Sequence, residues 1–184
     1  GAVLPPRNSE AGHGVEAWGD LTEMQQELFA RYQELYAAMV DNVDQNFGRL
    51  RAELVAMGEW DNTIVVFTSD NGGSREGQQN GTSSYFRTLM AHSRGDSPLD
   101  DIQVDHSRMD LMDGPQTLPH YPMGWGMASG TPFRLYKVNT HQGGHQVPFI
   151  VSKGSGLPDA GGIRRQYQHV TDLLPTVLDL VGVE

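Results

Sequence analysis

The chain has 184 residues, of which 38% are hydrophobic and 20% are charged, a composition typical of one soluble globular domain or of a piece of a larger one. A net charge of -10 argues against a nucleic-acid backbone as the main partner, because phosphate binding needs a basic face. The chain has no cysteine, which excludes disulfides, thiolate metal sites and a cysteine nucleophile within it. We see no signal peptide and no apolar run long enough to cross a membrane.

The first long element in chain order is a helix predicted over residues 22–57, after an extended, Gly- and Pro-rich lead-in over residues 1–20. Apolar residues recur every three or four positions along the helical range, as they do on one face of a helix. Thr22 followed by Gln25 matches a capping box at its start, and Gly58 suits a left-handed cap at its end.

A buried strand followed by a polar turn is predicted within residues 63–73. The stretch "TIVVFTS" is rich in β-branched residues and does not alternate between apolar and polar positions. This pattern is typical of a parallel-sheet strand that is covered on both faces. A helix followed by such a strand is the αβ half of a βαβ unit.

The rest of the chain divides into a loop and a closing strand and helix. Residues 74–130 are rich in Gly, Ser, Asp and Pro and show no clear periodicity, which predicts a long functional loop or insertion. Residues 131–184 contain "VPFIVS", predicted as a second buried strand, and "VTDLLPTVLDLVG", predicted as a helix.

The turn after the first strand has residues suited to an ion. In open α/β sheets, ligands bind outside the carboxyl ends of the strands, where Asp70 and Asn71 are expected. Their carboxylate and amide oxygens are hard ligands that suit Ca²⁺ or Mg²⁺. Gly72 and Gly73 allow unusual backbone angles and the close approach of a ligand. Taken alone, the same four residues also make an ordinary polar turn.

A second polar segment precedes the second strand. Lys137 is a mobile point charge suited to an anion, and His141 and His145 can hydrogen-bond or transfer protons. Taken alone, these residues fit a solvated surface loop equally well.

Several motifs in the same order resemble the sulfatase family over most of residues 22–184. The stretch "YAAMVDNVDQNFGRLRAELVAMGEWDNTIVVFTSDNGG" resembles the part of sulfatases that contains their second metal-binding segment. The stretch "TPFRLYKVNTHQGGHQVPFIV" resembles the segment that supplies a sulfate-contacting lysine, and "HVTDLLPTVLDLVGVE" the helix after it. The stretch "YPMGWGMASGTPFRLYK" is similar to the bacterial arylsulfatase branch.

The resemblance implies an α/β, alkaline-phosphatase-like fold with a mostly parallel sheet between helices, of which residues 1–184 would form a partial domain. Sulfatases hydrolyse sulfate esters with a formylglycine, made from Cys or Ser, beside a divalent ion that is usually Ca²⁺. By resemblance, Asp70 and Asn71 are metal ligands and Lys137 is a catalytic residue that contacts the sulfate. His141 lies where the family varies, so we expect only proximity to the substrate.

The chief departure from the family concerns its opening half, which is not matched here. That half carries an aspartate pair on the metal and the motif that becomes formylglycine, whereas this chain has no Cys and no Ser-x-Pro-x-Arg. We therefore expect the isolated chain to bind Ca²⁺ weakly and to lack sulfatase activity. Gln146 and Gly130 also replace an Arg and an Asn that are common in the family.

The expected function is hydrolysis of a small-molecule sulfate ester, with two alternatives. One is a phosphoester or phosphonate hydrolase of the same superfamily, whose members often have His where this chain has Asn71. The other is a non-catalytic, sulfatase-like binding module. We expect no nucleic-acid or membrane partner, and the oligomeric state and natural substrate are open. The absence of disulfides slightly favours the cytoplasm, and the resemblance favours a bacterial source.

Overall fold

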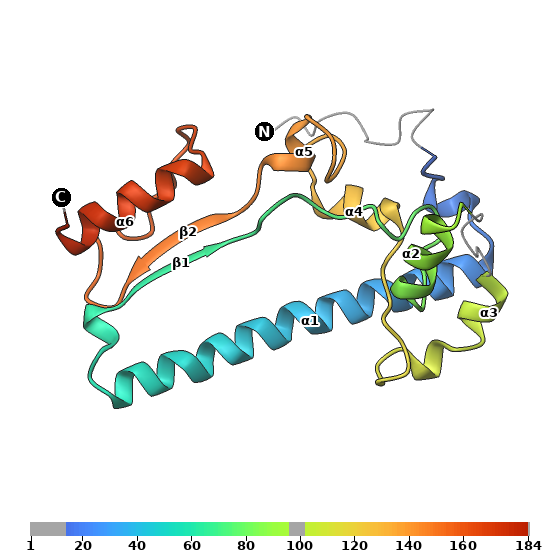
Figure 1. Ribbon diagram of the computed structural model, residues 1–184, viewed down its shortest axis with the longest axis horizontal. Coiled ribbons are helices and arrows are strands. Elements are labelled where there is room, and N and C mark those ends of the chain that lie inside the picture. Colours follow the sequence, from blue (N-terminus) through green and yellow to red (C-terminus); the bar gives the residue numbers. More distant parts are fainter. Residues whose placement is uncertain (1–13, 96–101, 184) are drawn as a thin grey trace.

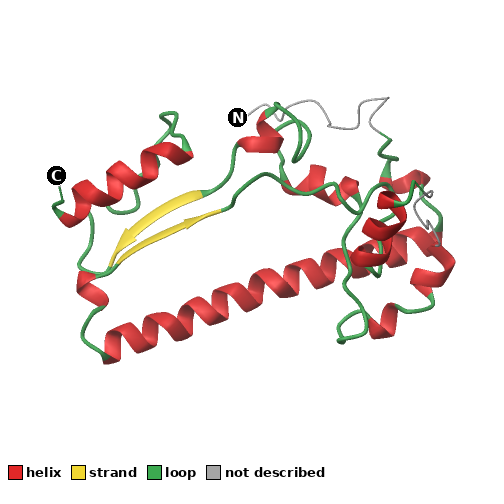
Figure 2. Cartoon of the chain, in the orientation of Figure 1, coloured by secondary structure: helices red, strands yellow, loops and turns green. Residues whose placement is uncertain are grey.

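The computed structural model describes residues 14–95 and 102–183, so parts of the predicted lead-in and loop lie outside the described residues. In chain order, the elements are η1 (Trp18–Asp20), α1 (Glu23–Ala56), η2 (Trp60–Asn62), β1 (Ile64–Thr68), α2 (Tyr85–Ser93), α3 (Ile102–His106), η3 (Met109–Leu111), α4 (Met123–Ser129), α5 (Gln142–His145), β2 (Phe149–Lys153), η4 (Val170–Asp172) and α6 (Leu173–Val181). Figure 1 shows α1 along one side, with α2, α3 and α4 around its N-terminal part. The strand pair lies between the C-terminal half of α1 and α6, as Figure 2 also shows.

Helix α1 confirms the helix predicted over residues 22–57. The Gln25 N–H donates to Thr22 Oγ1 at 3.3 Å, and the Thr22 N–H donates to Gln25 Oε1 at 2.9 Å, which completes the predicted capping box. At the other end, Gly58 adopts a φ of +76°, in the left-handed region that its lack of a side chain permits. Both ends are therefore set by residues close in sequence.

The apolar stripe of α1 is packed near its N-terminus only. Leu28, Phe29 and Tyr32 are buried in a core cluster with Met112 and Tyr121. Farther along the same face, large apolar side chains are exposed to solvent, among them Met39, Val43, Phe47 and Leu50. The periodicity predicted a face suited to burial, but within the described part of the chain most of that face beyond Tyr36 has no cover.

Strands β1 and β2 form an antiparallel pair. Ile64 lies opposite Lys153, and Thr68 lies opposite Phe149, so the chain runs back along β1 when it returns from α5. The described residues contain this one sheet of two strands, and its direction does not confirm the mostly parallel sheet that was expected.

The two strands are also less covered than the sequence predicted. Phe67 of β1 is 51% exposed and Ile150 of β2 is 55% exposed. A run of β-branched residues predicts a strand suited to a buried sheet, but whether such a strand is covered depends on residues distant in sequence, which the run itself does not specify.

The prediction of a long loop over residues 74–130 was wrong for much of its length. Helices α2, α3 and α4 lie in this range, with nine, five and seven residues. Each makes fewer than three turns, which is too short for apolar periodicity to be clear in the sequence.

Asp105 of α3 ties this helical region to α1. Its carboxylate, which is almost fully buried, accepts hydrogen bonds from the Tyr32 hydroxyl at 3.0 Å, the Ser83 N–H at 2.9 Å and the Ser83 hydroxyl at 2.5 Å. Arg87 of α2 completes the group at 3.4 Å. Burial, followed by the Asp105 charge, raises the pKa of Tyr32, which keeps its hydroxyl protonated as the donor. One carboxylate therefore joins three elements.

Helix α6 confirms the helix predicted near the C-terminal end, and Pro175 lies in its first turn, where proline is tolerated. Its apolar residues Leu174 and Val181 are exposed. Over residues 14–95 and 102–183, none of the helices combines the length and apolar character that a membrane crossing requires.

Candidate active site

The loop after β1 brings two oxygen-bearing side chains together. Asp70 and Asn71 follow Thr68, the last residue of the strand, after one intervening serine. The Asn71 side-chain amide donates to Asp70 Oδ1 at 2.6 Å, so the two side chains are in direct contact. Asp70 is exposed and Asn71 is half-buried.

Backbone hydrogen bonds join this loop to the segment that carries Lys137. The Gly72 N–H donates to the Gly144 carbonyl at 3.0 Å, and the Lys137 N–H donates to the Gly73 carbonyl at 2.8 Å. The structure thus brings together the two polar segments that the sequence placed 66 residues apart, counted from Asn71 to Lys137.

Gly72 and Gly73 make this junction possible because neither has a side chain. A Cβ atom on Gly72 would clash with the Gly143 carbonyl, and one on Gly73 would clash with the Gly126 carbonyl of α4. The sequence predicted glycines that admit a ligand or unusual angles. In the structure, the close neighbours are the backbones of α5 and α4.

Lys137 extends from the junction to Glu76. Its Nζ donates to Glu76 Oε1 at 2.7 Å, and both side chains are 35% exposed. The hydrogen bond that Lys137 donates to Glu76 raises the pKa of Lys137, and the charges of Glu76 and Asp70 add to that rise. Lys137 is therefore a firmly protonated cation near Asp70.

The second oxygen of Glu76 is held by a group that the sequence did not predict. Glu76 Oε2 accepts from the Ser74 hydroxyl and lies 3.7 Å from His120 Nε2. The Lys137 hydrogen bond, then the Ser74 hydroxyl, lowers the pKa of Glu76. Ser74 and Glu76 directly follow residues 70–73, the ligand loop. Their place next to predicted metal ligands was the one feature of the sequence that could have drawn attention to them. His120 lay in the range predicted as loop and had none.

His141 and His145 are exposed at the two ends of α5. The His141 side chain does not cap the helix. His141 thus precedes the α5 glycines that form the junction, and we assign its imidazole no role.

The donors in the loop fit a hard divalent cation as part of a shell. One carboxylate and one amide oxygen are typical Ca²⁺ ligands, but Ca²⁺ takes about six to eight oxygens. Among the residues that the structure describes, no group of three or more His, Asp or Glu side chains is close enough to hold a metal ion.

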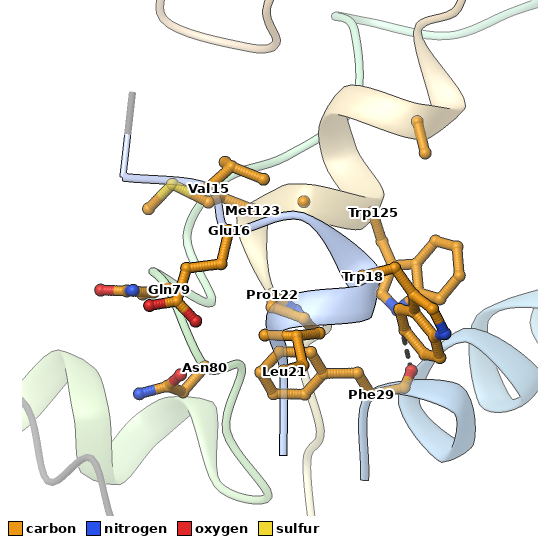
Figure 3. Close-up of a pocket in the computed structure, with 12 residues that line it drawn as sticks. Val15, Glu16, Trp18, Leu21, Phe29, Gln79, Asn80, Pro122, Met123 and Trp125 are labelled. Carbon is orange, nitrogen blue, oxygen red and sulfur yellow. Dashed lines mark hydrogen bonds between the residues drawn. The ribbon is translucent and has the colours of Figure 1, made fainter. Parts of the chain in front are cut away.

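A separate apolar pocket lies by α4, where Figure 3 shows the rings of Trp18 and Trp125 close together. It has a volume of about 270 Å³, and the Trp125 indole donates to the Phe29 carbonyl at 2.8 Å on its wall. Neither the ligand loop nor Lys137 lines it, so this pocket is distinct from the candidate active site.

Comparison with known proteins decides the family. A sequence model described as Sulfatase matches residues 7–183. The chain belongs to the sulfatase family. Membership implies the α/β, alkaline-phosphatase-like fold class, although the described residues show mainly helices and one antiparallel strand pair.

Individual proteins that are similar to this chain are also sulfatases by name. An uncharacterized sulfatase of Schizosaccharomyces pombe is 34% identical over 173 residues, which are 94% of this chain and 29% of the relative. An arylsulfatase of Klebsiella aerogenes is 29% identical over 168 residues, 91% of this chain and 33% of the relative. An N-acetylglucosamine-6-O-sulfatase of Bacteroides thetaiotaomicron is 50% identical over 44 residues, 24% of this chain and 8% of the relative. The sulfatase chain thus spans about a third of the length of the first two.

Proposed function

We propose that this chain supplies one side of a site that hydrolyses aryl sulfate esters. The supporting observation is the junction that holds Lys137 against Gly73, three residues after Asp70, in a member of the sulfatase family. Similarity to the Klebsiella aerogenes arylsulfatase favours an aryl ester over other sulfate esters.

In this proposal, Asp70 and Asn71 hold a Ca²⁺ ion through their side-chain oxygens. The bound ion would supply Lewis-acid stabilisation of the charge on the sulfuryl oxygens. Lys137 would bind the same oxygens, and because it is fixed and protonated, it would stabilise their charge without first reorganising. Nucleophilic chemistry by a formylglycine requires a Cys or a Ser-x-Pro-x-Arg motif, which this chain lacks.

The 184-residue chain alone should therefore bind the ion and the anion weakly and not turn over substrate. We expect a Ca²⁺ dissociation constant of about 10⁻⁴–10⁻³ M, as for sites with few ligands. Titrations of the ¹⁵N-labelled chain with CaCl₂ and with sodium sulfate, followed by NMR shifts at residues 70–73 and 137, measure both. Asp70→Asn should abolish the Ca²⁺ response, whereas the matched control Asp61→Asn, on η2 at the far end of β1, should leave it unchanged.

Two results would contradict the proposal. One is turnover of p-nitrophenyl sulfate by the homogeneous chain, which would require a nucleophile that we have not assigned. The other is a Ca²⁺ response that survives Asp70→Asn. Inorganic phosphate serves as the comparison anion, because tighter binding of phosphate than of sulfate would favour the phosphoester alternative.

A further inference from the structure

Glu76 is bound through both of its carboxylate oxygens. Oε1 accepts from Lys137 Nζ at 2.7 Å, and Oε2 accepts from the Ser74 hydroxyl. The Ser74 N–H in turn donates to the Tyr121 hydroxyl at 3.2 Å. A carboxylate that is held on both sides keeps one orientation, and so does the amine that it binds.

His120 contacts both Ser74 and Tyr121 and so helps to hold Glu76 in place. Its Nδ1 donates to the Tyr121 carbonyl at 2.9 Å, its Nε2 lies 3.1 Å from Ser74 Oγ, and its ring stacks on Tyr85 at 5.7 Å between centroids. The imidazole is 19% exposed and is therefore fixed by packing and by hydrogen bonds. None of these residues was assigned a role by the sequence motifs.

The Glu76 charge has two opposite effects on an anion site built around Lys137. It orders the Lys137 amine, which favours charge stabilisation at one point. It also offsets part of the amine's charge and repels an incoming anion, which weakens ground-state binding.

We propose that Glu76 is a positioning residue that holds the Lys137 amine in place and limits how strongly this amine attracts sulfate. The inference rests on the function proposed above, because it concerns the same lysine. Removal of the carboxylate should free the amine and tighten the binding of sulfate at the same time. A residue with a merely structural role would lower stability and would not tighten sulfate binding.

The lysine content of the chain allows a sharp test. Lys137 and Lys153 are its two lysines, so a mass-spectrometric time course of acetylation yields one signal for the paired amine and one internal reference in β2. In Glu76→Gln, the ratio of the Lys137 rate to the Lys153 rate should rise about two- to fivefold, the range for a partly exposed ion pair. The matched control Glu59→Gln, an exposed residue next to η2, should leave the ratio unchanged.

Sulfate protection supplies the second measurement. The sulfate concentration that halves the Lys137 rate should fall about two- to fivefold in Glu76→Gln relative to the unaltered chain. An unchanged rate ratio, or weaker protection in the variant, would overturn the positioning role. A complete lack of protection in every variant would instead overturn the proposed function, and the rate ratio would still decide the role of Glu76.

Ser74→Ala covers the case in which Glu76→Gln does not fold. It keeps the Glu76 charge and removes the hydroxyl that holds Oε2. The Lys137 rate ratio should rise in the same direction by a smaller factor, and an unchanged ratio would count against the proposal.

Discussion

At Gly72, the addition of a single methyl group should disrupt the backbone contacts of the candidate active site. A Cβ there would meet the Gly143 carbonyl, which is backbone and cannot turn away as a side chain can. We expect Gly72→Ala to lower the free energy of unfolding by about 1–3 kcal/mol, the usual cost of overpacking. Chemical denaturation followed by circular dichroism measures this change.

Gly48 is the matched control, because it lies in α1 with nothing within 4 Å of a new Cβ. Gly48→Ala should raise the free energy of unfolding by about 0.5–1 kcal/mol through helix propensity. Equal effects of the two substitutions would contradict the close backbone contact at Gly72.

The Glu76–Lys137 pair should stabilise the chain over a defined range of pH. The pKa of Glu76 is below its ordinary value of 4.5, so its contribution is present above pH 4.5 and is lost as the pH falls through the folded-state pKa. The pKa of Lys137 is above its ordinary value of 10.5, so its contribution is present below pH 10.5 and is lost as the pH rises through the folded-state pKa.

The melting temperatures of the unaltered chain and of Glu76→Gln measure this contribution. We expect a constant difference between about pH 5 and pH 10 that corresponds to less than about 1 kcal/mol, because both side chains are a third exposed and water screens them. The difference should disappear in acid. A difference that grows below pH 4 would mean that another group sets it.

At the scale of elements, Asp105 links α3 to α1 and to α2. Asp105→Ala should lower the free energy of unfolding by about 3–5 kcal/mol, because it leaves Arg87 and the Tyr32 hydroxyl without their shared acceptor. Asp110→Ala, an exposed change on η3, should cost less than about 0.5 kcal/mol. Thermal and urea denaturation compare the two variants, and similar losses would refute the assigned role of Asp105.

The elements that the sequence predicted well are those whose determinants are local. Thr22, Gln25 and Gly58 set the ends of α1 through contacts within a few residues. The direction of β2 relative to β1 depends on how a chain of some eighty residues returns, which no local pattern contains. The short helices α2 and α3 owe their position to contacts such as those of Asp105, 73 residues from Tyr32.

In the candidate active site, too, some residues could be predicted from local sequence and others could not. Asp70, Asn71 and Lys137 were predicted from motifs, and the structure brings their segments together. Glu76 was missed because its partner Lys137 lies 61 residues away. His120 was missed because its position depends on a bridge between Thr82 and His120 that the sequence does not reveal.

The whole molecule presents apolar faces on α1, on the strand pair and on α6. Exposed residues on these faces include Phe47, Phe67, Ile150 and Leu174. Exposed apolar patches and uncovered strand edges favour association. We expect the 184-residue chain to self-associate at micromolar concentration, with an average mass that rises with concentration in analytical ultracentrifugation.

Leu50→Lys should reduce this association, because it places a charge in the apolar face of α1. Gln45→Lys adds the same charge to the same helix at a polar position and is the matched control. A monomer with a sharp, reversible melt would refute the expectation of association, and so would equal effects of the two variants.

The junction between the ligand loop and the Lys137 segment is made by main-chain atoms of Gly72, Gly73 and Gly144. Its geometry therefore does not depend on the side chains that lie between, such as Thr140 and His141. Substitutions at those exposed positions should therefore leave the backbone hydrogen bonds of the junction in place. The same separation offers protein engineers a loop whose side chains can be randomised while the backbone junction stays as it is.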